Sequence, residues 1–265
     1  MAQSRRTAYF ISDAHFGIAI EGSENRDRVF CKLMEKVYQT GSDLFIIGDL
    51  FDFWIEYKYA IRPDYFLILA QLNRLVNAGV NVYYLAGNHD FALGKFLNET
   101  IGIVICPDTL DITLQGKKVH LYHGDGILKK DVGYRILKRL LRNRFNQKLY
   151  KMLHPDLGVP FGIFCSGSSR KHSTRLLTPE LIREYRTEAF RQLDSGYDIV
   201  MYGHTHHGEI VHTHNGKVYC NTGAWLGHYN YVTMEEGELC LWKFSQDGSS
   251  KMVPAIDLKT GSSKS

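Results

Sequence analysis

Five short apolar segments of the chain each end in a cluster of Asp, Asn, His and Gly residues. The segments are AYFIS, DLFII, VNVYYLA, KVHLY and YDIVMY, and the clusters after them begin at Asp13, Gly48, Gly87, His123 and Gly203. Segments of this length that are rich in aromatic and β-branched side chains are too short for helices and are typical of buried strands. The sequence therefore predicts five buried strands, each with polar side chains at its carboxyl end.

Helical patterns separate the first three of these strands. Apolar residues spaced by three and four run from Val29 to Val37 and from Phe66 to Val76. Strands that alternate with helices predict an α/β fold layered around a largely parallel sheet. Because ligands of such folds bind outside the carboxyl ends of the strands, we expect the five polar clusters to share one site.

The stretch Lys129–Leu153 departs from this alternation and predicts one long helix with an apolar stripe. Its opposite face is basic and consists of Lys138, Arg139, Arg142 and Lys148. We interpret residues 126–177 as a helical insertion that caps the shared site. Beyond it, the patterns predict a helix over Pro179–Leu193 and antiparallel strands between Glu209 and Phe244.

We expect a single domain over residues 1–256 and a disordered tail over residues 257–265. No apolar run approaches the roughly 18 residues of a membrane span, and the start of the chain lacks the apolar core of a signal peptide. The five cysteines are scattered and form no C-x-x-C pair, which is typical of reduced thiols in a cytosolic chain. The sequence therefore predicts a cytoplasmic protein.

The net charge of +4 is distributed unevenly. Between Asp125 and Leu193 there are 15 Lys and Arg against 6 Asp and Glu, so this segment alone carries +9. Its basic helix is either a solvated helix packed on its own domain or a surface that meets anionic headgroups while its apolar stripe accepts acyl chains or enters the bilayer interface. A nucleic-acid groove is disfavoured, because few aromatic side chains are available there for stacking on bases.

The five clusters together offer two carboxylates, an amide oxygen and four imidazoles. The candidate metal ligands are Asp13, His15, Asp49, Asn88, His123, His204 and His206. Taken singly, each cluster could be a turn or a hydrogen-bonded core histidine, but their order at successive strand ends favours a metal site. Oxygen and imidazole donors without thiolate suit manganese, iron or zinc. Seven donors are too many for one ion, so we predict two divalent ions, with manganese favoured and Asp49 as the bridging ligand.

These clusters resemble the five motifs of the calcineurin-like metallophosphoesterases, which read D-x-H, G-D-x-x-D, G-N-H, H and G-H-x-H. The resemblance implies a fold of layered β-sheets flanked by helices. It also implies which residues hold each ion: Asp13, His15, Asp49 and His206 hold one, and Asp49, Asn88, His123 and His204 hold the other.

Within this superfamily the chain most resembles the UDP-2,3-diacylglucosamine diphosphatases of the lipid A pathway. Gly48–Trp54 matches G-D-L-F-x-x-W, Gly223–Trp225 matches G-A-W, and His123-Gly124-Asp125 is followed by Asp131 and Tyr134 in D-x-x-Y spacing. Ser168, His172 and Arg175 keep the spacing of the family's S-x-x-x-N-x-x-K element but only part of its chemistry. The resemblance implies cleavage of a nucleotide-linked lipid to UMP and an acylated sugar 1-phosphate. Its implied substrate-binding residues are Asp131, Tyr134, Ser168, His172 and Arg175.

His89 departs from the diphosphatase family, in which many members have Arg at this position. A histidine here matches the general acid of the wider superfamily. We therefore expect His89 to stabilise or protonate the leaving oxygen, oriented by Asp52 as an imidazole–carboxylate pair. The alternative role of Asp52 is that of a helix N-cap.

Two other classes of function remain open on the sequence: a phosphodiesterase or nuclease of the same fold, and a binding scaffold that has lost the chemistry. None of the seven ligands is missing, which argues against the scaffold. The expected partners are a nucleotide-linked lipid and, through the basic insertion, an anionic membrane surface. We expect no nucleic acid and no obligate protein partner, and a cytoplasmic location peripheral to the inner membrane.

Overall fold

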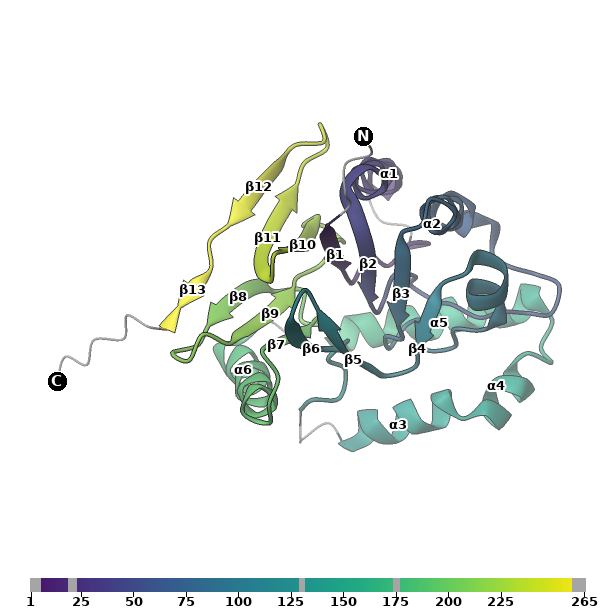
Figure 1. Cartoon of the computed structure of the whole chain (residues 1–265). Coiled ribbons are helices and arrows are strands. Elements are labelled where there is room, and N and C mark those ends of the chain that lie inside the picture. The colour runs from purple at the N-terminus through teal and green to yellow at the C-terminus, as the bar shows by residue number, and fades with distance from the viewer. Residues whose placement is uncertain (1–5, 19–22, 129–131, 174–176, 259–265) are drawn as a thin grey trace.

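Two facing β-sheets, with helices on both outer sides, make up the body of the protein (Figure 1). The computed structural model describes residues 6–18, 23–128, 132–173 and 177–258. The strands are β1 (Thr7–Ile11), β2 (Gly41–Ile47), β3 (Asn81–Leu85), β4 (Val104–Cys106), β5 (Thr109–Leu114), β6 (Lys117–Tyr122), β7 (Ile199–Tyr202), β8 (Gly208–His212), β9 (Val218–Thr222), β10 (Asn230–Glu235), β11 (Glu238–Phe244), β12 (Ser250–Val253) and β13 (Ile256–Asp257). The helices are α1 (Ser23–Thr40), α2 (Phe66–Asn77), α3 (Val132–Arg142), α4 (Arg144–Tyr150), α5 (Pro155–Ser173) and α6 (Pro179–Asp194), with a short 3₁₀ turn at Pro63–Tyr65 and a π turn at Phe96–Ile101.

The five predicted strands are confirmed as β1, β2, β3, β6 and β7, but they do not share one sheet. The first sheet has the order β12-β11-β10-β1-β2-β3-β4, and the second has the order β13-β8-β9-β7-β6-β5. β1 to β4 pair in parallel, as do β6, β7 and β9, while β10 runs antiparallel to β1 and β8 to β9. The predicted α/β fold of layered sheets flanked by helices is confirmed, and the first three predicted strands pair in parallel as expected. The division of the five strands between two sheets was not predicted, because strands buried on both faces look alike in sequence whichever sheet they join.

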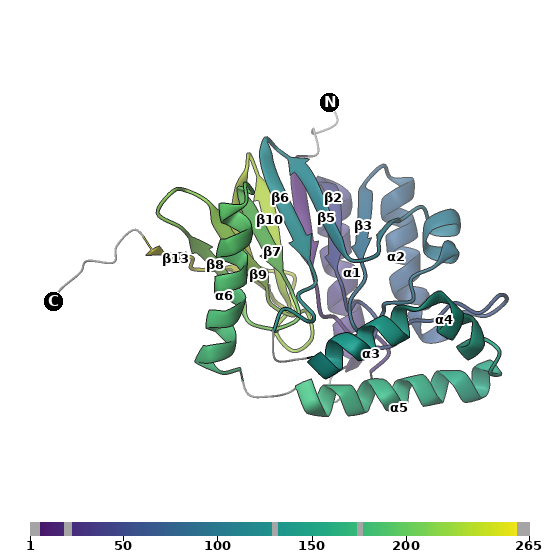
Figure 2. The same cartoon turned by 90° about the horizontal axis from the view of Figure 1, so that it is seen from below.

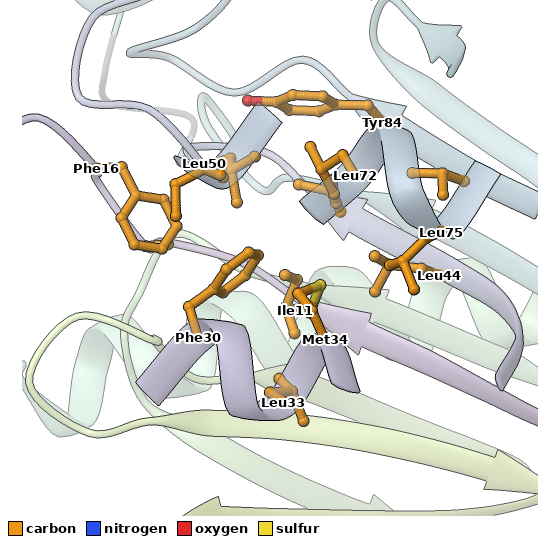
Figure 3. Close-up of a cluster of buried hydrophobic side chains, with 14 of the residues drawn as sticks. Ile11, Phe16, Phe30, Leu33, Met34, Leu44, Leu50, Leu72, Leu75 and Tyr84 are labelled. Atoms are coloured by element: carbon orange, nitrogen blue, oxygen red, sulfur yellow. The ribbon is translucent and has the colours of Figure 1, made fainter. Parts of the chain in front are cut away.

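Alternate residues of β1 pack into two different cores. Tyr9 and Ile11 face α1 and α2 in the first core, part of which is shown in Figure 3. Ala8 and Phe10 join the second core, which lies between the two sheets. A third core lies between the second sheet and α6. Because successive side chains of a strand point to opposite faces, each sheet packs against helices on one face and against the other sheet on the other. The result is four layers in the order helix, sheet, sheet, helix.

The predicted helices at α1, α2 and α6 are confirmed, but the single long helix over 129–153 was wrong. α3 ends at Arg142, and Asn143 has an extended backbone with φ −67° and ψ 123°. The Asn143 side chain accepts hydrogen bonds from the backbone N–H groups of Phe145 and Asn146 and so caps a new helix, α4. The apolar spacing continues across this break, and the pattern therefore did not reveal it.

α3, α4 and α5 lie together at one end of the two sheets (Figure 2), within the range expected for the cap. We call these three helices the cap and the rest of the described chain the body. Residues 259–265 of the predicted tail lie outside the described residues, whereas Asp257 belongs to β13. Among the described residues, no helix combines the length and the apolar composition needed to cross a bilayer.

Candidate metal centre

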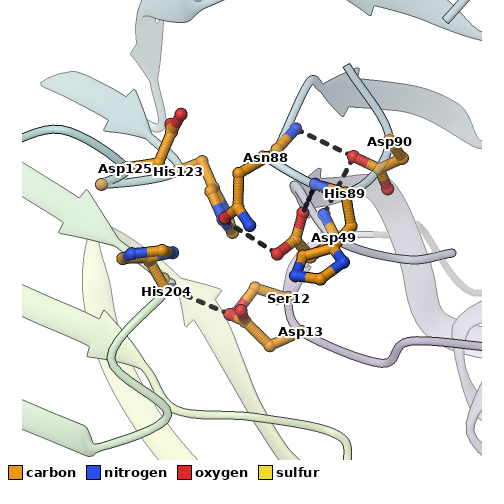
Figure 4. A network of polar contacts seen from close by, with 12 residues as sticks. Ser12, Asp13, Asp49, Asn88, His89, Asp90, His123, Asp125 and His204 are labelled. Carbon is orange, nitrogen blue, oxygen red and sulfur yellow. Dashed lines mark hydrogen bonds and ion pairs between the residues drawn. The ribbon is translucent and has the colours of Figure 1, made fainter. Parts of the chain in front are cut away.

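Loops at the ends of five strands bring the seven predicted ligands to one place. Asp13 and His15 follow β1, Asp49 follows β2, Asn88 follows β3, His123 follows β6, and His204 and His206 follow β7. In Figure 4, the side chains of Asp13, Asp49, Asn88, His123 and His204 point toward one another. The shared site therefore forms where the carboxyl ends of strands from two sheets meet.

The ligand atoms fall into two groups. In the first group, Asp13 Oδ1 lies 3.3 Å from His206 Nε2 and 3.9 Å from His15 Nε2. In the second group, Asp49 and His123 come together with His204, and these ligand atoms all lie within 4.8 Å of one another. Each group has the mixture of carboxylate and imidazole donors that suits a first-row divalent ion.

Asp49 lies between the two groups. Its Oδ2 atom is 3.3 Å from His123 Nε2 in one group and 3.9 Å from His15 Nε2 in the other. Asn88 adds an amide oxygen on the second side, with Oδ1 3.0 Å from His123 Nε2. A carboxylate in this position can be shared by two ions, as paired metal centres require.

The backbone at these ligands adopts a conformation that is uncommon outside glycine. Eight described non-glycine residues have a positive φ. Five of the eight are predicted ligands, with φ between 47° and 66°: Asp13, His15, Asp49, His204 and His206. Such conformations each cost of order 1–3 kcal/mol for a constrained residue and cluster at functional sites, where surrounding contacts hold them in place.

Asp90, which was not among the predicted site residues, supplies several of those contacts. Its carboxylate accepts hydrogen bonds from the backbone N–H groups of Asp49 (3.1 Å), Gly87 (2.9 Å) and Phe51 (3.3 Å), and also from the Tyr84 hydroxyl. One buried side chain therefore ties the loop after β2 to the loop after β3. Its place directly after Gly87-Asn88-His89 was the available signal.

Two glycines of the motifs are required by close approach. A Cβ atom on Gly48 would lie 2.4 Å from His123 Nδ1, and one on Gly87 would lie 2.1 Å from Asp49 Oδ1. Any side chain at either position would displace a candidate ligand. Gly48 also has a φ of 76°, which favours glycine on its own.

Electrostatics keep both carboxylates of the centre ionised. Burial raises the pKa of Asp13, but His206 and His123 outweigh it and bring the pKa to about 2. Burial likewise opposes ionisation of Asp49, and the surrounding histidines, His123 foremost, hold its pKa well below the ordinary value. Burial, with His123 nearby, lowers the pKa of His204 to about 4, so this imidazole is neutral at pH 7 and able to bind a metal.

The residues present fit divalent metal ions. Asp13 Oδ1 and both ring nitrogens of His15 are buried and have no hydrogen-bond partner among the residues that the structure describes. Buried polar atoms without partners are rare in native proteins, and a cation would satisfy Asp13 Oδ1 and one nitrogen of His15. Separations of 3.3–3.9 Å between donor atoms are close to those of ligands around an ion bound at 2.0–2.2 Å.

His89 lies beside this centre and near the Asp52 carboxylate, as expected, but two other groups contact its ring more closely. Its Nδ1 atom is 2.7 Å from Ser166 Oγ of α5 and 3.1 Å from the Asp52 backbone oxygen. The Asp52 carboxylate is farther away, with Oδ1 3.6 Å from His89 Nδ1 and 3.7 Å from His15 Nδ1. Ser166 is 77 residues from His89 in the chain, and no sequence pattern linked the two.

The structure does not describe the side chains of the predicted substrate-binding residues. Asp131 and Arg175 lie outside the described residues. Tyr134 lies on α3, and Ser168 and His172 lie on α5, but only their backbone is described. These five assignments stay predictions.

Two of the four residues predicted to form the basic face, Lys138 and Arg142, point at the body and pair with its acids. Lys138 Nζ lies 2.9 Å from the buried Asp125 carboxylate and 3.2 Å from Asp108. Arg142 lies 2.7 Å from Asp108 and also donates to backbone oxygens of the loop after β3. Both acids lie outside α3, so the residue pattern of the helix does not reveal them.

The predicted membrane-facing role therefore does not fit Lys138 and Arg142. The opposite side of α3 carries the apolar stripe, and its side chains are exposed. Exposed large apolar residues of the three cap helices and the turn between α4 and α5 are Ile136, Leu137, Leu140, Leu141, Phe145, Leu149, Met152, Leu153, Leu157, Phe161 and Phe164. We call this set the apolar cap face.

Comparison with known proteins agrees with this geometry. Residues 7–208 match the calcineurin-like phosphoesterase family. The chain therefore belongs to that family, and it is a metal-dependent hydrolase.

Its relatives carry a more specific name. The UDP-2,3-diacylglucosamine hydrolase of Pasteurella multocida strain Pm70 is 30% identical over 215 residues, which is 78% of this chain and 85% of the relative. The protein of the same name from Haemophilus influenzae strain PittGG is 28% identical over 236 residues, with coverage of 86% and 95%. That from Porphyromonas gingivalis strain W83 is 27% identical over 256 residues, with coverage of 89% and 97%.

Proposed function

We propose that this protein hydrolyses the pyrophosphate bond of UDP-2,3-diacylglucosamine, or of a closely related nucleotide-linked lipid, in the lipid A pathway. The products are UMP and an acylated sugar 1-phosphate. The observation that carries the proposal is the placement of an apolar cap face on helices whose other side contacts the phosphoesterase centre. A substrate with a pyrophosphate and acyl chains needs both features, and the relatives named above carry the name of this activity.

Within the centre, we assign Asp13, His15, Asp49 and His206 to one ion and Asp49, Asn88, His123 and His204 to the other, with manganese as the favoured metal. Bound divalent ions supply positive charge that attracts a phosphate ester and acidifies water. Asp13 and Asp49 contribute the ionised carboxylates that hold such ions, and Asp90 fixes the loop that carries Asp49.

We assign His89 to the leaving oxygen. Its Nδ1 atom is engaged by Ser166 and by the Asp52 carbonyl oxygen, which leaves Nε2 to contact the substrate. Asp52 serves as the residue that supports both His89 and His15. Head-group contacts are assigned to Asp131, Tyr134, Ser168, His172 and Arg175.

We also propose that the cap attaches the protein reversibly to an anionic membrane, the inner membrane of the cell, from the cytoplasmic side. Apolar side chains such as Phe164 and Met152 are 74% and 81% exposed. Exposed basic residues lie among them, including Arg139, Arg144 and Lys148. An apolar face with interspersed positive charge binds at the interface of anionic bilayers.

The deciding assay follows release of UMP from UDP-2,3-diacylglucosamine by purified protein with Mn²⁺. A generic phosphodiester, bis(p-nitrophenyl) phosphate, is assayed beside it, and Asp49→Ala serves as the inactive control. We expect rapid release of UMP, with the deacylated analogue a much poorer substrate because its remote binding energy is lost. Failure to cleave the lipid, combined with rapid cleavage of oligonucleotides or cyclic nucleotides, would replace this proposal with a nuclease or phosphodiesterase of the same fold.

A further inference from the structure

Ser166 is a buried hydroxyl through which the cap touches the reaction centre. It lies on α5 and is 8% exposed. Its Oγ atom is 2.7 Å from His89 Nδ1 and 2.8 Å from the backbone oxygen of Asp52. It therefore contacts both residues that we assign to the leaving-group side of the centre.

The hydrogens in this contact can be assigned from the chemistry of the groups. A carbonyl oxygen only accepts, so the single Oγ–H of Ser166 is donated to the Asp52 oxygen. Ser166 Oγ must then accept from His89, and Nδ1 therefore carries a proton. The second contact of Nδ1, 3.1 Å from the same carbonyl oxygen, requires the same proton. Both contacts select the Nδ1-protonated form of the ring.

The packing of α5 against the body fixes the position of the Ser166 hydroxyl. Gly158, Gly162 and Ser166 are spaced by four and share one buried side of the helix. A Cβ atom on Gly158 would lie 2.1 Å from the Tyr57 hydroxyl oxygen, and one on Gly162 would lie 2.2 Å from the Phe53 ring. α5 therefore packs against the segment after β2 at a distance that only glycine allows.

We infer that Ser166 is a positioning residue, which holds the ring of His89 in one orientation and one tautomer and so makes the reaction centre depend on a docked cap. The inference rests on the role proposed above for His89. In this arrangement the proton at Nδ1 is held by the cap and the Asp52 carbonyl, and Nε2 is the atom presented to the substrate. Undocking of α5 would remove the Ser166 contact and leave Nδ1 with the longer contact to the Asp52 carbonyl oxygen, so the ring would be held less firmly.

A double-mutant cycle separates this role from simple packing. Ser166→Ala should lower kcat about tenfold, the scale of one hydrogen bond, with KM changed by less than about threefold. In a His89→Ala background, the same substitution should change kcat by less than about twofold, because no ring remains to be positioned. Cys165→Ala, an exposed neighbour on the same helix, is the matched control and should retain wild-type rates.

A second measurement uses the wild-type chain and does not depend on the folding of Ser166→Ala. Nitrogen-15 NMR of the imidazoles, in protein loaded with diamagnetic Zn²⁺ in place of Mn²⁺ and with His89→Ala to assign the signal, should show His89 protonated at Nδ1. An Nε2-protonated neutral ring would overturn the inference. Equal loss of kcat in both backgrounds, accompanied by a lower Tm, would also overturn it and assign Ser166 to packing.

Failure of the proposed function can be distinguished from failure of the positioning role of Ser166. If UDP-2,3-diacylglucosamine is not cleaved but bis(p-nitrophenyl) phosphate is, the cycle is measured on the latter and the positioning role is still tested. If His89→Ala leaves kcat unchanged on both substrates, the role of His89 fails, and the positioning role of Ser166 fails with it.

Discussion

The body and the cap of this protein turn opposite faces of their helices inward. In the body, α2 buries Ile68, Leu72 and Leu75 under the first sheet. In the cap, α3 turns Lys138 and Arg142 toward the body and leaves its apolar stripe exposed. Two helices of similar length, 12 and 11 residues, are thus used in opposite ways.

The difference shows what each helix is built to contact. Burial of apolar side chains is the main stabilising term in a fold, and α2 supplies it to the core. Ion pairs, hydrogen bonds and the close packing of α5 hold the cap on the body. The side chains of the apolar cap face are exposed and contribute little to this packing. Apolar patches of this extent on a protein surface mark sites for ligands or other surfaces. We therefore propose that the apolar cap face binds lipid and that the body carries out the phosphate chemistry.

The largest effect is expected in the body, at the residue shared by the two ligand groups. Asp49→Ala should abolish turnover and remove metal, because both groups lose a ligand. Metal analysis should find about two ions per chain in the wild type. Asp13→Ala should mainly empty one position. A single bound ion in the wild type, with an active Asp49→Ala variant, would show that the ligand assignment is wrong.

His89 should be the next most sensitive position. His89→Ala is expected to lower kcat by about 10²–10⁴-fold, the usual contribution of acid–base catalysis. His89→Arg should not fully restore the rate if the imidazole transfers a proton. If instead the residue only binds phosphate, the arginine variant should recover most activity, and the loss in His89→Ala should be found largely in KM.

Matched leucines test the contrast between α2 and α3 directly. Leu72→Ala removes a fully buried side chain and should lower the free energy of unfolding by about 2–5 kcal/mol. Leu140→Ala, on the apolar cap face, should change it by no more than about 0.5 kcal/mol. Chemical denaturation measures both. Comparable losses in the two variants would mean that the apolar cap face packs within the fold.

The smallest effect is expected when pairs of basic residues in the cap are neutralised. Neutralising the exposed Arg139 and Lys148 should weaken binding to anionic liposomes by about 1 kcal/mol for each residue, and added salt should weaken it further. Neutralising Lys138 and Arg142 should instead loosen the cap and lower Tm, with little direct effect on flotation, because these residues pair with Asp108 and Asp125. Equal binding to neutral and anionic liposomes would contradict the electrostatic part of this account.

The sequence was most informative where local spacing and chemistry coincide. Each predicted ligand directly follows a short buried strand, so the residues of the centre could be named before their distances were known. The order of the strands in the two sheets was harder to predict. β2 and β6 are both apolar segments that pack into the same core, so their residue types do not show which sheet each strand joins. The assignment of those strands to two sheets depends on pairing partners that lie far along the chain.

Contacts between distant segments account for what could not be predicted. Asp125 and Asp108 compensate Lys138 across the fold, and Ser166 meets His89 only once α5 has docked. The break at Asn143 was hidden for a different reason: the apolar spacing continues through it, and an asparagine is compatible with both a helix interior and a cap.

The division of labour between cap and body is tested most directly by the acyl-chain dependence of turnover. We compare kcat/KM for UDP-2,3-diacylglucosamine and for its deacylated analogue, in the wild type and in a Leu140→Asn/Phe161→Asn variant. The account predicts a strong preference of the wild type for the acylated substrate. In the variant this preference should collapse, while the rate on the deacylated analogue stays unchanged. A preference that survives these substitutions, or an equal loss on both substrates, would contradict the assignment of lipid to the cap and of phosphate chemistry to the body.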